Sequence, residues 1–330
     1  MLRSDRNFTR RKTLIALACC GLAAFMGSVQ AAEWPDRPVK MLVGYPAGGA
    51  NDLVARAVAA RLTESLKQSF LVENRTGAAG NIGAEIAARA APDGYTFLLT
   101  DIGNLSNAPN VYKLPFDIFK DFTPVTTVSY SPHLLAVHPS VPVKNTQEFI
   151  ALAKATPGKL NIPTGIGTAP HFAAMLFAQR TGVKWTYLGT RGGADTARTV
   201  ATGEGDAMFL GMLQTLPHVQ SKRVKLVAVS SAQRHPTLPD TPTLGEAPGL
   251  AGFVTGSWQG FLAPARVPPE IIAKVNAELA RILNQPEMKQ KLGTQGADPV
   301  ANSPQETAKW MVAENARYAK LIKQTGFKLE

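Results

Sequence analysis

Hydrophobic positions along the chain switch between short runs typical of buried strands and longer segments with helical spacing. The pattern predicts a first strand over residues 39–43, and the apolar residues within 53–66 keep the helical period of about 3.6. Two further strands are predicted over residues 70–73 and 95–100, with an alanine-rich helix to about Ala90 between them. Strands that alternate with helices in this way indicate an α/β fold with parallel sheets.

Capping signals and prolines mark the helices in the rest of the chain. Asn145 and Glu148 form an N-x-x-E capping box, and Ser303 and Glu306 form another, followed by proline at the first helical position. The elements predicted here are helices from 145 to about 156, from 171 to about 180, from 269 to 283 and from 304 to about 324, and strands over 207–210 and 224–229. The C-terminal third is therefore expected to be rich in helix.

Three glycine-rich turns each connect a predicted strand to a predicted helix. They lie at residues 43–53, 73–84 and 161–173. The first N–H groups of a helix have no partner within the helix, and the helix dipole adds a partial positive charge there, so such turns favour an anion. Glycine also allows a ligand to approach the backbone closely, because there is no side chain to block it. The repeated turns predict an anion-binding site.

The N-terminal segment has the features of an export signal. Basic residues open it, an apolar run over 14–29 follows, and a small-x-Ala cleavage site ends it. We expect residues 1–31 to be a signal peptide that is cleaved after Ala31 or Ala32. The adjacent Arg10 and Arg11 leave open whether export uses the general secretory or the twin-arginine route.

The composition of the predicted mature chain excludes several kinds of functional site. Both cysteines, Cys19 and Cys20, lie in the signal, which excludes disulfides, cysteine nucleophiles and zinc–thiolate or iron–sulfur sites from the rest. Removal of the signal takes five of the 35 Lys and Arg and one of the 24 Asp and Glu, which leaves a net charge of +7. This charge favours anionic small molecules. We expect no nucleic-acid partner, because the densest basic stretch, 222–225, is short and lacks aromatic residues.

Motifs of common enzymes are absent from the sequence. There is no G-x-x-x-x-G-K-[ST] phosphate loop, no H-E-x-x-H zinc helix and no G-x-S-x-G nucleophile elbow. The five histidines have no metal-ligand spacing, although His171 opens a helix behind a glycine-rich turn and is expected to face a cleft. We expect no metal and no cofactor. A secreted hydrolase or lyase with Asp52 or Asp101 as general base stays open as an alternative.

The predicted mature chain also carries a long series of motifs in a fixed order. They are Trp34-Pro35-Asp36-Arg37-Pro38, Pro46-Ala47-Gly48-Gly49-x-x-Asp52-x-x-x-Arg56, Val72-Glu73-Asn74-Arg75-x-Gly77-Ala78-x-Gly80-Asn81-Ile82-Gly83, Pro92-Asp93-Gly94-Tyr95-Thr96, Asp121-Phe122-Thr123-Pro124-Val125, Gly165-x-Gly167-Thr168-x-x-His171, Leu238-Pro239-Asp240-Thr241-Pro242-Thr243 and Ser257-Trp258-x-Gly260-x-x-Ala263-Pro264. The series resembles the Bug-type extracytoplasmic solute receptors of tripartite tricarboxylate transporters. The resemblance covers nearly the whole mature chain.

The resemblance implies a two-lobed α/β periplasmic binding protein, type II-like, in which each lobe is a mainly parallel sheet flanked by helices and the ligand cleft lies between the lobes. Residues 32–131 and 255–330 are expected to form lobe 1, and residues 132–254 lobe 2. Crossings between the lobes are expected near residues 125–135 and 250–262. The C-terminal helices are expected to pack on lobe 1.

The resemblance further implies that main-chain amides and ordered water hold a ligand that bears a carboxylate. Carried onto this sequence, the loop from Tyr45 to Asp52 and the loop from Thr164 to His171 face each other across the cleft. The ligand-binding residues expected on this basis are Tyr45, Ala47, Gly48, Gly49, Asn51, Asp52, Asp101, Thr164, Gly165, Gly167, Thr168, His171 and Arg191.

The chain departs from the family's pattern in the second lobe. Residues 188–192, Leu-Gly-Thr-Arg-Gly, stand where such receptors usually have Val-Pro-Tyr-Lys-Gly, and Asp101 and Asp195 stand where small or neutral residues are usual. Arg191 keeps a cation that can bind a second carboxylate, and its alternative is a solvated loop residue. Asp195 is predicted to cap a helix.

The function implied by the resemblance is that of a periplasmic receptor without catalytic activity. It is expected to capture a small organic carboxylate or dicarboxylate and deliver it to the membrane permease subunits of a tripartite transporter. A monomer is expected. A receptor of the same fold that acts as a ligand sensor for a signalling partner stays open as an alternative.

Overall fold

The computed structural model describes residues 33–327 of the 330-residue chain. The chain divides into two units, Met1–Asp36 and Arg37–Glu330. The helices and strands described below all belong to the second unit. The signal peptide expected over residues 1–31 lies outside the described residues.

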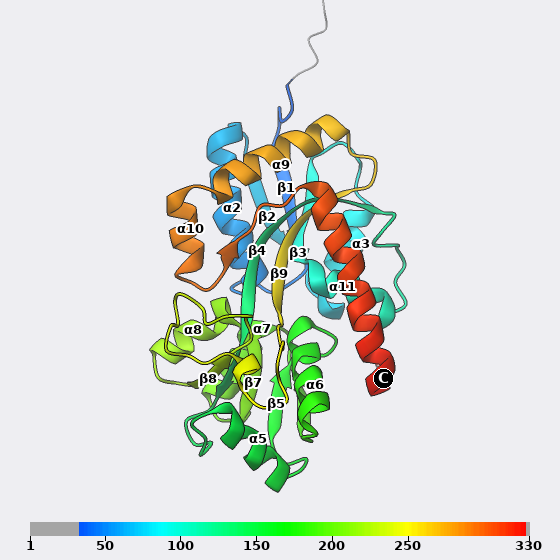
Figure 1. Cartoon of the computed structure of the whole chain (residues 1–330). Helices are drawn as coiled ribbons and strands as arrows, with labels where there is room; N and C mark the ends of the chain where they lie inside the picture. The colour runs from blue at the N-terminus through cyan, green and yellow to red at the C-terminus, as the bar shows by residue number, and fades with distance from the viewer. Residues whose placement is uncertain (1–32, 328–330) are drawn as a thin grey trace, which may run out of the picture. The chain divides into compact units, whose positions relative to one another are not determined.

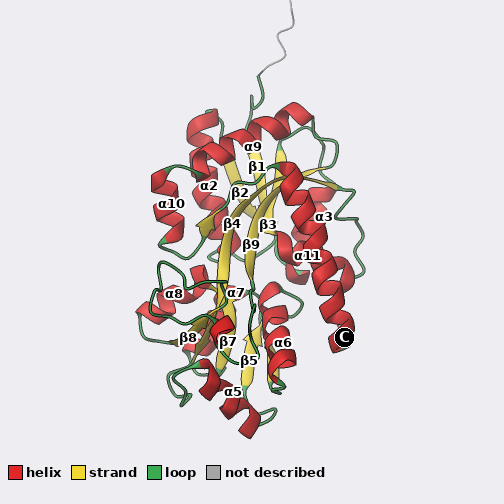
Figure 2. Cartoon of the chain, in the orientation of Figure 1, coloured by secondary structure: helices red, strands yellow, loops and turns green. Residues whose placement is uncertain are grey.

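Parallel strands form one end of the main sheet (Figure 2). β1 (Val39–Val43) lies between β2 (Phe70–Asn74) and β3 (Thr96–Asp101) and pairs in parallel with both. β9 (Gly256–Pro264) pairs antiparallel with β3, and β4 (Phe122–Val137) pairs antiparallel with β9. The strands predicted at 39–43, 70–73 and 95–100 are therefore confirmed.

The 16-residue strand β4 extends beyond these strands into a second group. Its second half pairs antiparallel with β7 (Ala207–Gly211) and β8 (Lys225–Val229). The parallel pair β5 (Asn161–Thr164) and β6 (Thr186–Gly189) lies in this group too, and the short β10 (Asp298–Pro299) pairs with β4 in the first group. β4 and β9 thus connect two groups of strands, which are the two lobes.

The expected two-lobed α/β fold is confirmed, but the expected mainly parallel sheets are wrong in detail. The sheets are mixed, because β4 and β9 run antiparallel to each other and to their other partners. The chain leaves the first lobe along β4 and returns along β9, so these crossing strands must run in opposite directions. The lobe boundaries expected at 131/132 and 254/255 stay a prediction.

Helices cover both groups of strands (Figure 1). Those around the first group are α2 (Ala50–Leu66), α3 (Asn81–Ala88), α4 (Ile102–Asn107), α9 (Pro269–Leu283), α10 (Pro286–Gly293) and the first half of α11 (Pro304–Thr325), and those around the second are α5 (Thr146–Ala155), α6 (Ala169–Thr181), α7 (Gly193–Ala201) and α8 (Met212–Gln220). Short 3-10 turns lie at Ala78–Gly80, Ala108–Asn110 and Leu244–Glu246. Asn145 and Ser303 cap α5 and α11 as the sequence predicts.

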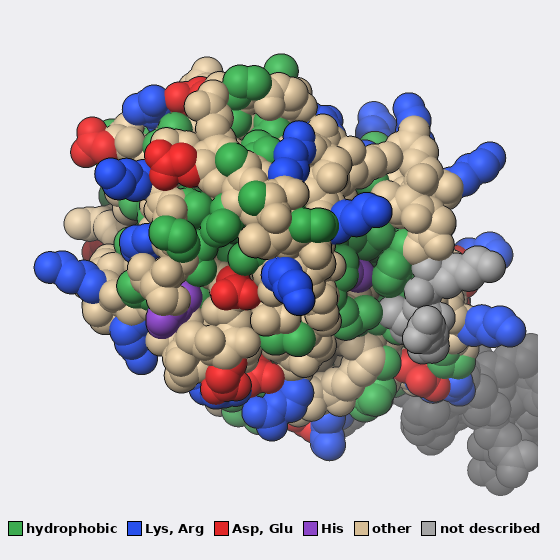
Figure 3. Space-filling view, turned by 90° about the horizontal axis from the view of Figure 1, so that it is seen from below, with side chains coloured by type: hydrophobic (Ala, Val, Ile, Leu, Met, Phe, Trp, Pro, Cys, Tyr) green, Lys and Arg blue, Asp and Glu red, His purple; other side chains and the backbone are tan. Residues whose placement is uncertain are grey.

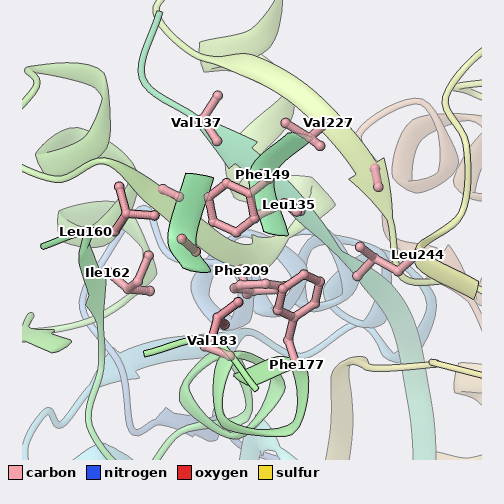
Figure 4. Packing of buried hydrophobic residues seen from close by; sticks show 14 of the residues in the cluster. Leu135, Val137, Phe149, Leu160, Ile162, Phe177, Val183, Phe209, Val227 and Leu244 are labelled. Atoms are coloured by element: carbon pink, nitrogen blue, oxygen red, sulfur yellow. The ribbon is translucent and has the colours of Figure 1, made fainter. Parts of the chain in front are cut away.

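Each lobe is built around its own hydrophobic core. In the first, Leu42, Leu98 and Leu262 from three neighbouring strands pack together. In the second, Phe177 and Phe209 lie at the centre of a cluster of buried aromatic and aliphatic side chains, with ring centroids 5.1 Å apart (Figure 4). Full burial of such side chains stabilises the fold by roughly 1.5–3 kcal/mol each. The loops that join the strands and helices of each lobe are therefore attached to a packed core.

The C-terminal helix α11 departs from the packing expected for it. Met311 in its first half belongs to the core of the first lobe. Tyr318 and Leu321, further along, pack against Phe172 of α6. The helix was expected on lobe 1 alone, but its C-terminal half reaches α6, because it continues past the end of the first core with apolar residues still facing inward.

Candidate functional site

A cavity of about 840 Å³ lies between the two lobes. Its walls come mainly from four segments, within residues 44–51, 76–80, 165–170 and 190–198, and from the facing ends of β3 and β9. Each of the three glycine-rich turns contributes to it. The loops after β1 and β5 thus line one cavity, which agrees with the arrangement that the sequence predicts.

The expected ligand-binding residues divide into two sets. Those that line the cavity are Tyr45, Gly49, Asn51, Asp101, Gly165, Thr168 and Arg191. Those that lie outside its lining are Ala47, Gly48, Asp52, Thr164, Gly167 and His171. The second set includes residues that hold the loops in place.

Asp52 holds the turn that follows β1. The Gly48 N–H donates to Asp52 Oδ2 at 2.9 Å. Arg56 Nε donates to the same oxygen at 3.0 Å, and Asn74 Nδ2 donates to Oδ1 at 3.0 Å. Burial acts to raise the pKa of Asp52, but the hydrogen bonds and the charge of Arg56 outweigh it, so the pKa lies below its usual value. Asp52 is therefore an ionised anchor of the turn, and its carboxylate is already engaged.

Three helices begin at the cavity without a side-chain cap. The first hydrogen bonds within α2, α6 and α7 are donated by Leu53, Phe172 and Thr196. The residues just before them have N–H groups with no partner in their own helix. Those that line the cavity are Ala50, Asn51, Gly193, Ala194 and Asp195. No N-cap side chain of these three helices makes a capping hydrogen bond. The cavity therefore receives backbone donors from α2 and α7, whereas α6, whose second residue is Pro170, adds only its helix dipole, and both effects favour an anion.

Residues 76–80 form a wall of the cavity, although no residue in them was expected to bind ligand. A Cβ at Gly44 would lie 2.6 Å from the Gly80 carbonyl oxygen, so the two backbones are in direct contact. Tyr45 Oη donates to the Ala79 carbonyl at 2.9 Å. The second glycine-rich turn of the sequence signals this wall, and glycine is required there because the backbone of β1 passes so close.

A polar wall stands at the end of β3. Asp101 caps α4, with Oδ1 accepting from the Asn104 N–H at 3.0 Å, and only 6% of the residue is exposed. Burial raises the pKa of Asp101 to about 6, against the opposing effect of hydrogen bonds from Asn104, Ser257 and Trp258. Asn104 and Gln259 line the cavity beside it. Neither was expected, since an isolated Asn or Gln carries no signal in a sequence.

Two cations of the second lobe, Arg191 and Arg198, lie beside Asp195. This residue is at the third position of α7, whose N-cap is Gly192, so the capping role predicted for it is wrong. It accepts instead from the Arg191 N–H at 3.2 Å and pairs with Arg198 at 3.1 Å. Hydrogen bonding to the Arg191 amide and pairing with Arg198 outweigh burial and hold the pKa of Asp195 below its usual value. The Arg191 side chain is 87% exposed, with Nε 3.6 Å from Asp195.

His171 lies behind the loop that precedes α6 and does not line the cavity. Its Nδ1 accepts from the Gly167 N–H at 3.2 Å, and its ring packs edge-on against Tyr187 with centroids 4.6 Å apart. Burial lowers the pKa of His171 to about 4, so the ring is neutral near pH 7. His171 therefore holds this loop in place from behind, whereas it was expected to contact the ligand.

Contacts across the cavity bring the two lobes together. A Cβ at Gly192 would lie 3.5 Å from Pro46 Cδ, so the turn after β1 meets the start of α7. On another side, Tyr112 Oη donates to the Ile166 carbonyl at 3.4 Å. The cavity is thus bridged at two places on its rim.

Residues 33–327 hold neither a cluster of metal ligands nor a helix that could span a membrane. In this part of the chain, no group of three or more His, Cys, Asp and Glu side chains is arranged to hold a metal ion. Among the helices of the same residues, none combines the length and the apolar character that a membrane crossing requires.

Sequence comparison finds one family. A family model described as the tripartite tricarboxylate transporter family receptor matches residues 54–327. The protein BugT of Bordetella pertussis is 32% identical over 332 residues, which cover 98% of this chain and 100% of BugT.

Solved structures give the same result. A protein of R. palustris solved with adipate has a TM-score of 0.86 and 35% identity, and the match covers 89% of this chain and 99% of that one. MatC from Rhodopseudomonas palustris, solved with bound malate, has a TM-score of 0.82 and 31% identity, covering 88% of this chain and 100% of MatC. Both similar proteins hold small carboxylates.

Proposed function

Because this chain belongs to the tripartite tricarboxylate transporter receptor family, we propose that it is a periplasmic receptor that binds a small organic carboxylate between its lobes. It delivers this ligand to the membrane permease subunits of a tripartite transporter. It performs no chemistry on the ligand, needs no cofactor and acts as a monomer.

One observation carries the proposal. The uncapped N-termini of α2, α6 and α7 meet at one cavity of about 840 Å³, and residues of the first turns of α2 and α7 line it. Backbone N–H groups at helix starts hold carboxylates without a permanent cation, so the ligand can be released when the lobes separate. Adipate and malate, held by two similar proteins, are of the size that such a cavity accepts.

The two carboxylates considered as general bases support binding rather than catalysis. Asp52 is already engaged by Gly48, Arg56 and Asn74 and lies outside the cavity lining. Asp101 accepts from backbone and hydroxyl donors as the cap of α4. A general base also needs a neighbouring group that stabilises the negative charge developing on the substrate, and the charge beside Asp101 is the negative one of Glu314. A receptor does not require either aspartate to take a proton from the ligand, so both residues fit this function with the contacts that they make.

The surface charge also fits a small-molecule receptor. On the face drawn in Figure 3, Lys and Arg side chains are scattered, with Asp and Glu side chains in several places among them. Nucleic-acid binding requires a continuous basic stripe instead. The net positive charge of the chain therefore acts as a weak general attraction for anions.

Calorimetry and thermal shift on the purified protein test the proposal. A panel of mono-, di- and tricarboxylates of three to eight carbons is titrated, and we expect at least one to bind with a stoichiometry of one and to raise the melting temperature. The bound compound is then released by denaturation and weighed by mass spectrometry. Recovery of the unchanged compound supports a receptor, and a product of altered mass contradicts it. Absence of binding across the whole panel also contradicts it.

A further inference from the structure

We propose that the ligand carries a hydroxyl or ammonium group on the carbon next to one of its carboxylates, and that Asp101 accepts a hydrogen bond from this group. The inference rests on the proposed function and deepens it, since it names the chemical class of carboxylate that the cavity selects. Three side chains at the end of the crossing sheet carry it: Asp101, Asn104 and Gln259.

Asp101 and Gln259 face the ligand from paired positions. They are direct partners in the antiparallel pairing of β3 with β9. Residues directly opposite in such a pair project to the same face with Cβ atoms about 4.5–5.5 Å apart. Both line the cavity. The ligand atoms at this wall therefore meet a carboxylate and an amide side by side.

Gln259 presents a donor. Its Oε1 accepts from Ser129 Oγ at 2.9 Å, which orients the amide. Its Nε2 is buried and has no hydrogen-bond partner among residues 33–327. A buried donor without a partner is costly, so a ligand acceptor is expected there. A carboxylate oxygen of the ligand supplies it.

Asn104 presents an acceptor. Its Nδ2 donates to Tyr45 Oη at 2.6 Å and to the Ala79 carbonyl at 2.9 Å, so both amide hydrogens are used within the protein. Its Oδ1 is buried and has no partner among the described residues. Asp101, in the same turn, is an acceptor too when ionised. This end of the cavity thus offers acceptors beside a single donor.

The charges around Asp101 decide which ligands suit it. Glu314 of α11 adds a negative charge near it and is itself paired with Arg317 at 2.7 Å. His133, behind Ser257, is neutral near pH 7 because burial lowers its pKa to about 3, and Tyr45 and Tyr318 are neutral too because burial raises the pKa of each. No cationic side chain among the described residues donates to Asp101. A ligand carboxylate alone would meet a like charge, whereas a ligand donor would satisfy it.

The arrangement matches a 2-substituted carboxylate. Its carboxylate oxygen accepts from Gln259, and its adjacent hydroxyl or ammonium donates to Asp101 and Asn104. An ammonium has three donors and also neutralises Asp101, and a hydroxyl has one donor. Either group distinguishes the ligand from an unsubstituted dicarboxylate of the same length.

Two matched series test the inference by calorimetry at pH 7.5. The first is succinate, malate and aspartate, and the second is glutarate, 2-hydroxyglutarate and glutamate, each chiral compound as both enantiomers. Within a series only the group on one carbon changes. We expect at least one substituted member to bind ten times or more tightly than the unsubstituted member. Binding of the unsubstituted member as tightly as the others overturns the inference and leaves the proposed function standing.

The pH dependence of the wild-type protein gives a test that needs no variant. Acceptance by Asp101 requires its carboxylate to be ionised, so affinity for the substituted ligand falls as the pH is lowered from 7 to 5. If Asp101 instead binds a plain carboxylate as a protonated acid, affinity rises over the same interval. A rise, or no change, contradicts the proposed role of Asp101.

Asp101→Asn provides the complementary test, because the amide keeps the shape and adds a donor. We expect the preference for the substituted member to fall by ten-fold or more. Asp117→Asn is the matched control, since Asp117 likewise accepts from a nearby backbone N–H, that of Phe119, and lies outside the cavity lining. An unchanged preference in Asp101→Asn overturns the inference. Because the readout is a ratio of affinities for one variant, partial loss of stability does not obscure it.

Discussion

The Gly48 N–H donates to the Asp52 carboxylate at 2.9 Å, so a glycine and an aspartate four residues apart close the turn that follows β1. Gly48 was expected to bind the ligand, but this hydrogen bond engages its N–H group within the protein. It leaves the next donors, the N–H groups at the start of α2, as those that face the cavity. The turn is therefore organised by its own side chain before any ligand arrives.

Loss of Asp52 should loosen this turn. Asp52→Ala removes hydrogen bonds to a guanidinium, an amide and a backbone N–H, and the free energy of unfolding is expected to fall by about 1.5–3 kcal/mol at pH 7. Because the folded-state pKa lies below the unfolded value near 4, this stabilisation is present above about pH 4 and is lost as the pH falls through the folded pKa. Urea unfolding of wild type and variant at several pH values measures it.

Glu287→Ala is the control for this measurement. Glu287 pairs with Arg61 at 2.7 Å on the surface, where its side chain is 79% exposed. Exposed pairs contribute between about 0 and 1 kcal/mol. A loss in Asp52→Ala no larger than that in Glu287→Ala would mean that Asp52 does not anchor the turn.

The close approach of Gly44 and Gly80 gives a second prediction. A Cβ at Gly44 would lie 2.6 Å from the Gly80 backbone oxygen, so Gly44→Ala is expected to displace the cavity wall and weaken carboxylate binding by at least ten-fold. Gly48→Ala is the matched control, because a Cβ there meets no atom within 4 Å and only the φ of +79° opposes it. It should cost about 1–2 kcal/mol of stability and leave binding nearly unchanged. Calorimetry of both variants decides, and equal losses of binding would contradict the assignment of Gly44.

Asp101 gives a prediction for the protein without ligand. Its folded-state pKa of about 6 lies above the unfolded value of about 3.9, so folding disfavours the ionised form. The stability it contributes is full below the unfolded pKa and declines until the pH passes the folded pKa, a change of roughly 2–3 kcal/mol. Asp101→Asn does not titrate. The stability of this variant relative to wild type should therefore rise between pH 4 and pH 6 and stay level above, as measured by urea unfolding, and a flat difference would contradict it.

Local patterns predict the parallel strands β1, β2 and β3 and the long helices α2, α9 and α11, but they miss several elements, among them the crossing strand β4. Pro124 and Pro132 argue against a strand, since proline cannot donate to the ladder. The structure accommodates them at irregular points: the register with β9 shifts next to Pro124, and Pro132 lies where β4 leaves β9 and begins to pair with β7. These compensations depend on strands more than seventy residues away, so no local window of the sequence contains them.

The site shows a similar division. Glycine-rich turns before helices predict the uncapped starts of α2 and α6, because that signal is local, but they do not include the start of α7 at Gly193. The roles of individual amide and carboxylate groups are harder to predict. Gly48 and Asp52 belong to the loop after β1 but bond to each other instead of lining the cavity. Asn104 and Gln259 line the cavity although they lie in elements without any recognisable motif. Which polar group is already engaged depends on tertiary contacts, and a sequence does not list them.

Arg191 provides the last prediction. Its side chain is 87% exposed at the cavity and is held only loosely, 3.6 Å from Asp195, so it can turn toward a ligand. A charge-assisted hydrogen bond contributes about 1.5–3 kcal/mol. Arg191→Ala should therefore weaken a dicarboxylate by roughly ten- to a hundredfold, and a monocarboxylate held by the first lobe should lose much less.

The decisive quantity is the ratio of the two losses, measured by calorimetry on one variant. Arg223→Ala serves as a control for the general field, because it removes the same charge from an exposed position outside the cavity lining. If the general positive charge alone attracts the ligand, both variants lose the same affinity, and neither changes the ratio of the dicarboxylate loss to the monocarboxylate loss. If Arg191 contacts the second carboxylate, only Arg191→Ala changes the ratio. No loss for either ligand in Arg191→Ala would make this arginine a solvated loop residue, and the second carboxylate would then depend on the N–H groups at the start of α7.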